Sequence, residues 1–130
     1  LVDKTTTVCY TKRGVSDLLE LTAENFENEI GLTPSQIIDL KALMGDKSDN
    51  IPGVAGVGEK SAMSLLSLYQ DLDGVYAHLD EISGALHAKL KNGKENAYFS
   101  KELATINIDV PLDLTLGECV LKMPFSFASL

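Results

Sequence analysis

The sequence contains no long apolar run. No stretch approaches the roughly 20 residues that a membrane-spanning helix needs, and the N-terminus shows no signal peptide, so we expect an intracellular protein without a membrane partner. Cysteine is scarce as well. Cys9 and Cys119 stand far apart, with no Cys-x-x-Cys motif and no histidine nearby, which argues against a zinc site or a disulfide framework. His78 and His87 have no partner at the spacing of a metal site or catalytic triad, and we expect both at the surface.

Basic residues are fewer than acidic ones. The 11 lysines and arginines oppose 19 aspartates and glutamates, for a formal net charge of −8, which argues superficially against a nucleic-acid partner. The distribution weakens that argument, because residues 41–60 hold three acids and three bases, and residues 91–102 hold three lysines against two glutamates. A local cationic face is what phosphate contacts need, so the composition predicts modest, salt-sensitive affinity for nucleic acid.

What is present can form one core. At 130 residues and 45% hydrophobic content, we expect a single compact domain or a part of one, and the absence of an initiator methionine indicates a segment of a longer protein. The pattern is mainly helical. Thr33 and Gln36 form a capping box with Pro34 at the first helical position, which predicts a helix from there to Gly45. Further helices are expected over residues 58–69, 71–79, 85–90 and 94–106.

Extended structure is expected only at the two ends. Residues 5–10 are β-branched and aromatic, which favours a strand, and a turn at residues 12–14 follows, with a connector over residues 18–26. Residues 108–116 alternate apolar and polar side chains, which predicts a half-buried strand that Pro111 confines to a sheet edge. Three tyrosines on expected helices are interpreted as core residues: Tyr69, Tyr76 and Tyr98.

The most informative segment is the glycine-rich stretch of residues 45–62, between two expected helices. Gly53, Gly56 and Gly58 allow positive φ and close approach of a ligand, so their N–H groups can form an anion nest. Gly58 also opens the next helix, whose positive dipole end attracts phosphate, and Lys60 adds a cation in its first turn. An ordinary solvated lysine is the alternative reading of Lys60.

Three known ligand-binding loops do not match this segment. A P-loop fails because Glu59 stands before Lys60-Ser61 and because the loop follows a helix rather than a strand, although nucleotide binding through this near match stays a remote alternative. The dinucleotide fingerprint fails on glycine spacing. An EF-hand starting at Asp46 fails at Ile51 and Val57, where glycine and glutamate are needed. The pattern that fits is a helix-hairpin-helix, which grips a nucleic-acid backbone without reading bases.

The segment from Gly45 to Ala62 resembles the signature of the 5′ nuclease domain of bacterial DNA polymerase I and its relatives, the flap endonucleases. The likeness extends to residues 37–44 and 102–112, with Ala55 and Ser61 as mild departures. It implies a mainly α fold with a helix-three-turn-helix, SAM-like unit and one or two short peripheral strands. It implies three parts: residues 1–30 as a remnant of the nuclease α/β core and connector, residues 31–106 as the DNA-binding domain, and residues 107–130 as a strand returning to that core. The chain looks like the C-terminal half of the domain.

The resemblance also implies roles for individual residues. Asp46 and Asp49 match two carboxylates that hold Mg²⁺ or Mn²⁺, whereas on the residues alone they could merely form capping turns with Ser48 and Asn50. The hairpin would bind phosphates of double-stranded DNA with a 5′ flap or nick, and K⁺ would bridge hairpin carbonyls and phosphate. The phosphate-binding residues expected are Gly53, Val54, Gly56, Val57, Gly58, Lys60 and Ser61. Further contacts could come from Lys47, Lys89, Lys91, Lys94 and Lys101, for which a solvated helix face is an equal alternative.

The implied function is the DNA-binding half of a metal-dependent 5′–3′ exonuclease acting in replication and repair, in the bacterial cytoplasm at the nucleoid. Most metal-binding carboxylates of this family lie in the N-terminal half of the domain, which would be this chain's partner. Two carboxylates do not complete a two-metal centre, so no complete catalytic set is expected here, and we predict neither DNA hydrolysis nor tight Mg²⁺ binding by this chain alone. The alternative is a non-catalytic helix-hairpin-helix module that binds duplex DNA or a protein.

Overall fold

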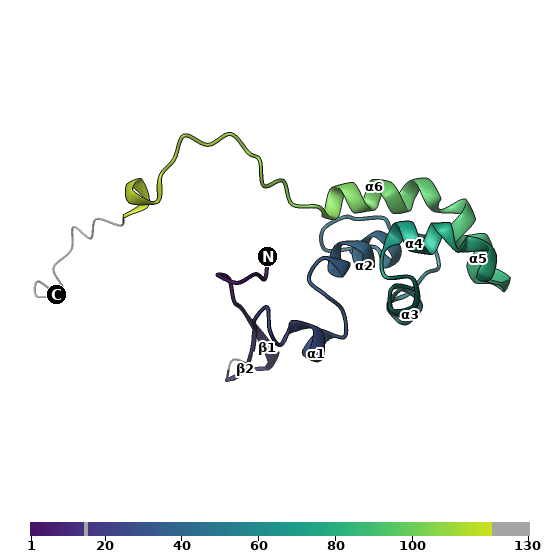
Figure 1. Cartoon of the computed structure of the whole chain (residues 1–130), viewed down its shortest axis with the longest axis horizontal. Coiled ribbons are helices and arrows are strands. Elements are labelled where there is room, and N and C mark those ends of the chain that lie inside the picture. Colours follow the sequence, from purple (N-terminus) through teal and green to yellow (C-terminus); the bar gives the residue numbers. More distant parts are fainter. Residues whose placement is uncertain (15, 121–130) are drawn as a thin grey trace, which may run out of the picture.

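The computed structural model describes residues 1–14 and 16–120. Two antiparallel strands come first, followed by helices, in an order that Figure 1 shows. The elements are β1 (Val8–Arg13), β2 (Asp17–Leu21), α1 (Phe26–Ile30), α2 (Gln36–Met44), α3 (Glu59–Tyr69), α4 (Leu72–Ala77), the 3₁₀ turn η1 (Leu79–Glu81), α5 (Gly84–Asn92), α6 (Lys94–Ala104) and the 3₁₀ turn η2 (Leu116–Cys119). The fold class predicted from the sequence, mainly helical with a short peripheral β element, is confirmed.

The core lies among the helices from α2 to α6. Helix α2 packs mainly against α6 and α3. Apolar residues at helical spacing supply the buried side chains, because each helix turns its apolar face inward. Leu43, Leu66, Leu72, Val75 and Leu90 are all completely buried. An ion pair also joins α6 to α2, since Lys101 Nζ lies 2.9 Å from Asp39 Oδ1. The Asp39 side chain is only 8% exposed.

Local signals set the helix boundaries. The predicted capping box is present: the Thr33 N–H donates to Gln36 Oε1 at 2.9 Å, and the Gln36 N–H donates to Thr33 Oγ1 at 3.4 Å. The Gln36 amide also donates to the carbonyl of Gln70 at 2.7 Å, which ties the start of α2 to the end of α3. Gly58 caps α3 as expected. The single helix predicted over residues 71–79 is instead two elements: α4 ends at Ala77, and the 3₁₀ turn η1 follows it.

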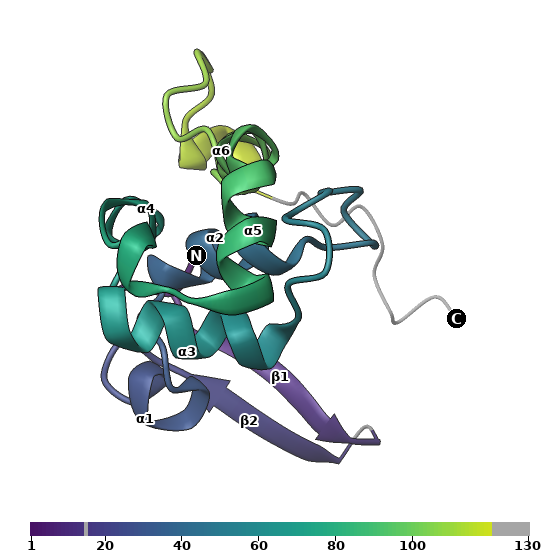
Figure 2. The ribbon, with the colours of Figure 1, turned by 90° about the vertical axis from the view of Figure 1, so that its right-hand side faces the viewer.

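The N-terminal part forms a β-hairpin rather than one strand and a connector. Val8 pairs with Leu21 and Tyr10 with Leu19, and the turn contains Gly14 at φ 62°. The second strand was missed because Leu18 and Leu19 are adjacent apolar residues, which breaks the alternation typical of a half-buried strand. Figures 1 and 2 show this hairpin beside α1, at one side of the helical part.

The strand predicted over residues 108–116 is wrong for this chain. Residues 106–115 contain no regular element and run away from the helices in Figure 1. Ile108 is 88% exposed and Leu112 is 73% exposed. Alternation favours a strand only where a neighbouring strand supplies hydrogen bonds, and none of the described residues does so here. Residues 121–130, the end of the predicted extension, lie outside the described residues.

Candidate nucleic-acid interface

The loop between α2 and α3 begins with a small closed turn. Helix α2 ends at Gly45, which has φ 75°. Asp46 and Ile51 then exchange two backbone hydrogen bonds of 2.9 and 2.8 Å, and Asn50 takes the left-handed conformation at φ 56°. This closure holds residues 46–51 as a rigid turn that carries Asp46 and Asp49, the two carboxylates that the sequence singled out.

The glycine hairpin of residues 53–58 is anchored from inside. The Gly53 N–H donates to Ser100 Oγ at 2.9 Å, and the Val54 N–H donates to the Leu43 carbonyl at 2.8 Å. The Val57 N–H donates to the Val54 carbonyl at 3.1 Å, and both valine side chains are buried. Of the seven residues predicted to bind phosphate, Gly53, Val54 and Val57 therefore have N–H groups already bound within the chain, and they support the hairpin.

The other four predicted residues form the exposed side of the hairpin: Gly56, Gly58, Lys60 and Ser61. Among the described residues, no acceptor receives the N–H groups of Gly56 or Gly58. The first N–H groups of α3 have no intrahelical partner and add the positive end of the helix dipole. A side chain at Gly58 would meet nothing within 4 Å, and its φ of −95° suits any residue. The chain itself therefore gives no steric reason for glycine there, whereas a ligand approaching closely would.

Lys89 reaches the hairpin from α5. Its Nζ donates to the Gly56 carbonyl at 2.9 Å, although the two residues are far apart in sequence. Lys47, Lys60, Lys91 and Lys94 are exposed.

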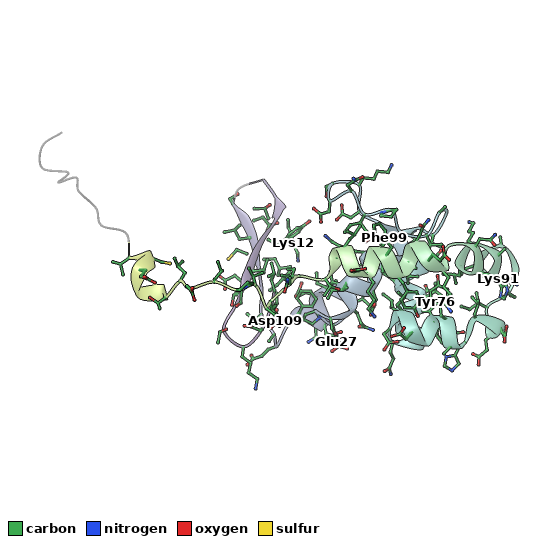
Figure 3. The ribbon with its side chains drawn as sticks, turned by 90° about the horizontal axis from the view of Figure 1, so that it is seen from above. Lys12, Glu27, Tyr76, Lys91, Phe99 and Asp109 are labelled. Atoms are coloured by element: carbon green, nitrogen blue, oxygen red, sulfur yellow. The ribbon has the colours of Figure 1, made fainter. Side chains whose placement is uncertain are left out.

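The other predicted lysines are less closely tied to the hairpin. Lys94 Nζ lies 5.5 Å from the centre of the Tyr76 ring, a cation–π contact. Figure 3 shows Lys91 at the end of the helical part opposite Lys12. Lys101 is held by Asp39 in the ion pair described above. The structure thus brings Lys89 to the hairpin and directs Lys101 elsewhere.

The carboxylates of Asp46 and Asp49 are joined by a lysine that sequence reasoning did not single out. Lys41 Nζ lies 2.9 Å from Asp46 Oδ2 and 2.6 Å from Asp49 Oδ2. Asp46 Oδ1 accepts hydrogen bonds from the Ser48 N–H at 2.9 Å and from the Ser48 hydroxyl at 2.5 Å. The Ser48 hydrogen bond and Lys41 hold the Asp46 pKa well below its ordinary value, and the two aspartates raise the pKa of Lys41. Within the part of the chain described, no group of three or more histidine, cysteine or carboxylate side chains gathers.

The tyrosines are structural, as predicted. The Tyr76 hydroxyl donates to the Leu90 carbonyl at 3.0 Å, and burial raises the Tyr76 pKa to about 12. The Tyr98 hydroxyl donates to Asp73 Oδ1 at 2.6 Å, and burial together with that bond raises its pKa as well.

The histidines differ from one another. His78 is exposed and stacks on Tyr69, with 5.2 Å between ring centroids. The expectation that both histidines lie at the surface is wrong for His87, which is half-buried with Nδ1 3.0 Å from the Leu79 carbonyl.

Comparison with known proteins decides the family. A family model described as "5'-3' exonuclease, C-terminal SAM fold" matches residues 32–126. The chain belongs to this family. Its relatives include DNA polymerase I of Bacillus subtilis, 48% identical over 113 residues, which are 86% of this chain and 13% of that protein. DNA polymerase I of Streptococcus pneumoniae is 45% identical over 125 residues, which are 95% of this chain and 14% of the relative. The chain thus spans about an eighth of the length of the relatives it matches.

A solved structure supports the fold. It is titled "Divalent metal ions (zinc) bound to T5 5'-exonuclease", and the match has a TM-score of 0.55 at 24% identity, covering 66% of this chain and 32% of that one. The resemblance inferred from the sequence is therefore confirmed at the level of the family and of the fold. Lys41 and Ser100 were missed, although Ser100 shares a helical face with Ala97 and Ala104, which is a signal for a buried polar residue.

Within the described residues, no helix has both the length and the apolar character needed to cross a membrane.

Proposed function

We propose that this chain is the part of a structure-specific 5′–3′ exonuclease that grips the backbone of duplex DNA next to a 5′ flap or nick. The observation that carries the proposal is the hairpin. Its exposed side presents the N–H groups of Gly56 and Gly58 and the start of α3, and its inner side is fixed to the core through Gly53 and Val54. Donors held in place by a rigid support bind phosphate without further ordering cost. Membership in the exonuclease family supports DNA as the ligand. The place of action that we propose is the bacterial cytoplasm, at the nucleoid.

Lysines near the hairpin supply the positive charge that phosphate binding needs. Lys60 stands in the first turn of α3, and the Lys89 ammonium lies against the Gly56 carbonyl with two N–H donors left for a phosphate. Lys47, Lys91 and Lys94 would extend the contact to neighbouring phosphates. A K⁺ ion at the hairpin, as the family resemblance suggests, would bind backbone carbonyls, of which the Gly56 carbonyl is already bound by Lys89.

Asp46 and Asp49 fit a divalent ion in part. Carboxylate oxygens are the ligands that Mg²⁺ and Mn²⁺ prefer, and the closed turn brings the two side chains to one lysine and hence to one place. Bound metal would activate water and stabilise charge on the scissile phosphate. With no third carboxylate gathered there among the described residues, we propose that the remaining ligands come from another part of the nuclease and that this chain alone does not hydrolyse DNA.

The test is DNA binding at several salt concentrations. A fluorescent duplex with a 5′ flap is titrated with wild type, Lys60→Met, Lys89→Met and the control Lys12→Met, which removes an exposed lysine of β1. Each hairpin variant should lower the slope of log affinity against log salt by about one, because one phosphate contact is lost. Lys12→Met should leave the slope unchanged.

Cleavage is followed in the same samples with Mg²⁺, and none is expected. Equal affinity for all four proteins would refute the hairpin as the binding surface. Absence of binding by wild type would favour the protein-binding module over the DNA-binding one.

A further inference from the structure

Lys41 occupies the space between the two candidate metal ligands. It lies in the last turn of α2, and its ammonium is within 2.9 Å of Asp46 Oδ2 and 2.6 Å of Asp49 Oδ2. Lys41 and Asp46 are partly exposed, at 34% and 23%, whereas Asp49 is exposed, at 55%. The Lys41 ammonium therefore contacts both carboxylates at once and joins the end of α2 to the turn.

The hydrogen bonds of Asp46 restrict where a metal could bind it. Oδ1 already accepts bonds from the Ser48 N–H, the Ser48 hydroxyl and, at 3.3 Å, the Asp49 N–H. These bonds keep the turn closed, so the oxygen that remains for a metal is Oδ2. That oxygen is the one that Lys41 contacts. A metal ion and the Lys41 ammonium therefore compete for the same atom.

We propose that Lys41 is an internal counter-ion that competes with divalent metal for Asp46 and Asp49. This inference rests on the proposed metal role of the two aspartates. A metal ion that binds both carboxylates displaces the ammonium from Oδ2, so part of its binding energy is lost in breaking two ion pairs. Coulombic attraction grows with ionic charge, so a divalent ion can displace the tethered lysine where a monovalent ion gains too little. Lys41 thereby lowers the affinity for every cation and leaves the site selective for divalent ones.

The test measures Mn²⁺ binding directly, through the loss of the electron paramagnetic resonance signal of free Mn²⁺. The proteins compared are wild type, Lys41→Met, Lys41→Arg and the control Lys47→Met. Lys47 is an exposed lysine on the same turn, so its loss changes the local charge equally. Each partly exposed ion pair is worth up to about fivefold in affinity, so Lys41→Met should bind Mn²⁺ about three to tenfold more tightly than Lys47→Met. Lys41→Arg keeps the charge and should bind as wild type does.

The possible outcomes distinguish failure of the competition by Lys41 from failure of the proposed metal role of Asp46 and Asp49. Binding by Lys41→Met that equals or falls below binding by Lys47→Met would overturn the competition and leave Lys41 as a residue that positions the carboxylates. Binding is expected to be weak, because two carboxylates do not complete the site, so Mn²⁺ is titrated into the millimolar range. Absence of binding by every variant over that range would overturn a metal site formed by Asp46 and Asp49 in this chain, and the competition with it. Thermal unfolding confirms that each variant is folded, and Lys41→Gln replaces Lys41→Met if the latter is not.

Discussion

The substitution Ser100→Ala should destabilise the protein although it removes a single oxygen atom. Ser100 is completely buried on α6, and its hydroxyl accepts a hydrogen bond from the Gly53 N–H at 2.9 Å. Gly53 is itself buried, and its Cα packs closely against the backbone of Gly45. Alanine would leave this donor buried without an acceptor.

The expected cost follows from that unsatisfied donor. A buried N–H that loses its partner costs about 1–3 kcal/mol, and the small volume lost adds little, so we expect a loss of about 2 kcal/mol in the free energy of unfolding. For a small domain whose urea m-value is about 1–3 kcal/mol per molar, this loss corresponds to a fall of about 1 M in the urea midpoint. Such a change is a large fraction of the 5–15 kcal/mol typical of a domain.

The assay is urea unfolding followed by circular dichroism, with Ser64→Ala as the matched control. Ser64 lies on the exposed side of α3, where its hydroxyl donates to the Lys60 carbonyl at 2.9 Å, so water replaces the lost bond and the midpoint should barely move. Exchange of the Gly53 amide hydrogen should also accelerate in Ser100→Ala. A midpoint for Ser100→Ala equal to that of Ser64→Ala would refute the reasoning, because it would show that the Gly53 N–H finds another acceptor.

Two further predictions concern the same loop. Gly53→Ala should lower the free energy of unfolding strongly, because φ is 64° and a methyl group would meet the backbone of Gly45. Gly58→Ala should change the free energy of unfolding by less than about 0.5 kcal/mol, and equal effects of the two substitutions in urea unfolding would contradict this account. The second concerns acid. Asp46 has a lowered pKa in the folded state, so its stabilising effect is present above the ordinary value of 3.8 and is lost as the pH falls towards the folded pKa. Asp46→Asn should therefore lose less stability than wild type between about pH 4 and pH 2, and parallel loss would show that Asp46 does not contribute.

Most helices from α2 to α6 and the glycine hairpin of residues 53–58 could be predicted because their signals are local, whereas β2 and α1 were not predicted. The capping box of Thr33 and Gln36, the glycine at the start of α3 and the spacing of apolar residues act within a few positions of one another, so the sequence is enough to place them. Gly53 and Gly56 likewise have positive φ, which is a local backbone requirement, whereas Gly58 does not. The family followed from the same residues, and the comparison with known proteins confirms it.

Predictions were wrong or not possible where a structure depends on residues far away in the sequence. The alternation over residues 108–116 is a real pattern, but a strand forms only beside another strand, and no described strand lies there. The sequence also could not show which N–H groups of the glycine hairpin lack an acceptor within the chain. The acceptor for the Gly53 N–H, Ser100, lies on α6, 47 residues later.

The sequence by itself determined most of the helix boundaries, which faces of the helices are apolar and that residues 45–62 form a glycine-rich hairpin between two helices. Only the tertiary structure decided that Ser100 supports this hairpin, that Lys89 reaches the Gly56 carbonyl and that Lys41 stands between Asp46 and Asp49. The physical reason is the range of each interaction. Backbone propensity and capping act between neighbours in the chain, whereas hydrogen bonds and ion pairs join whatever residues packing brings within about 3 Å.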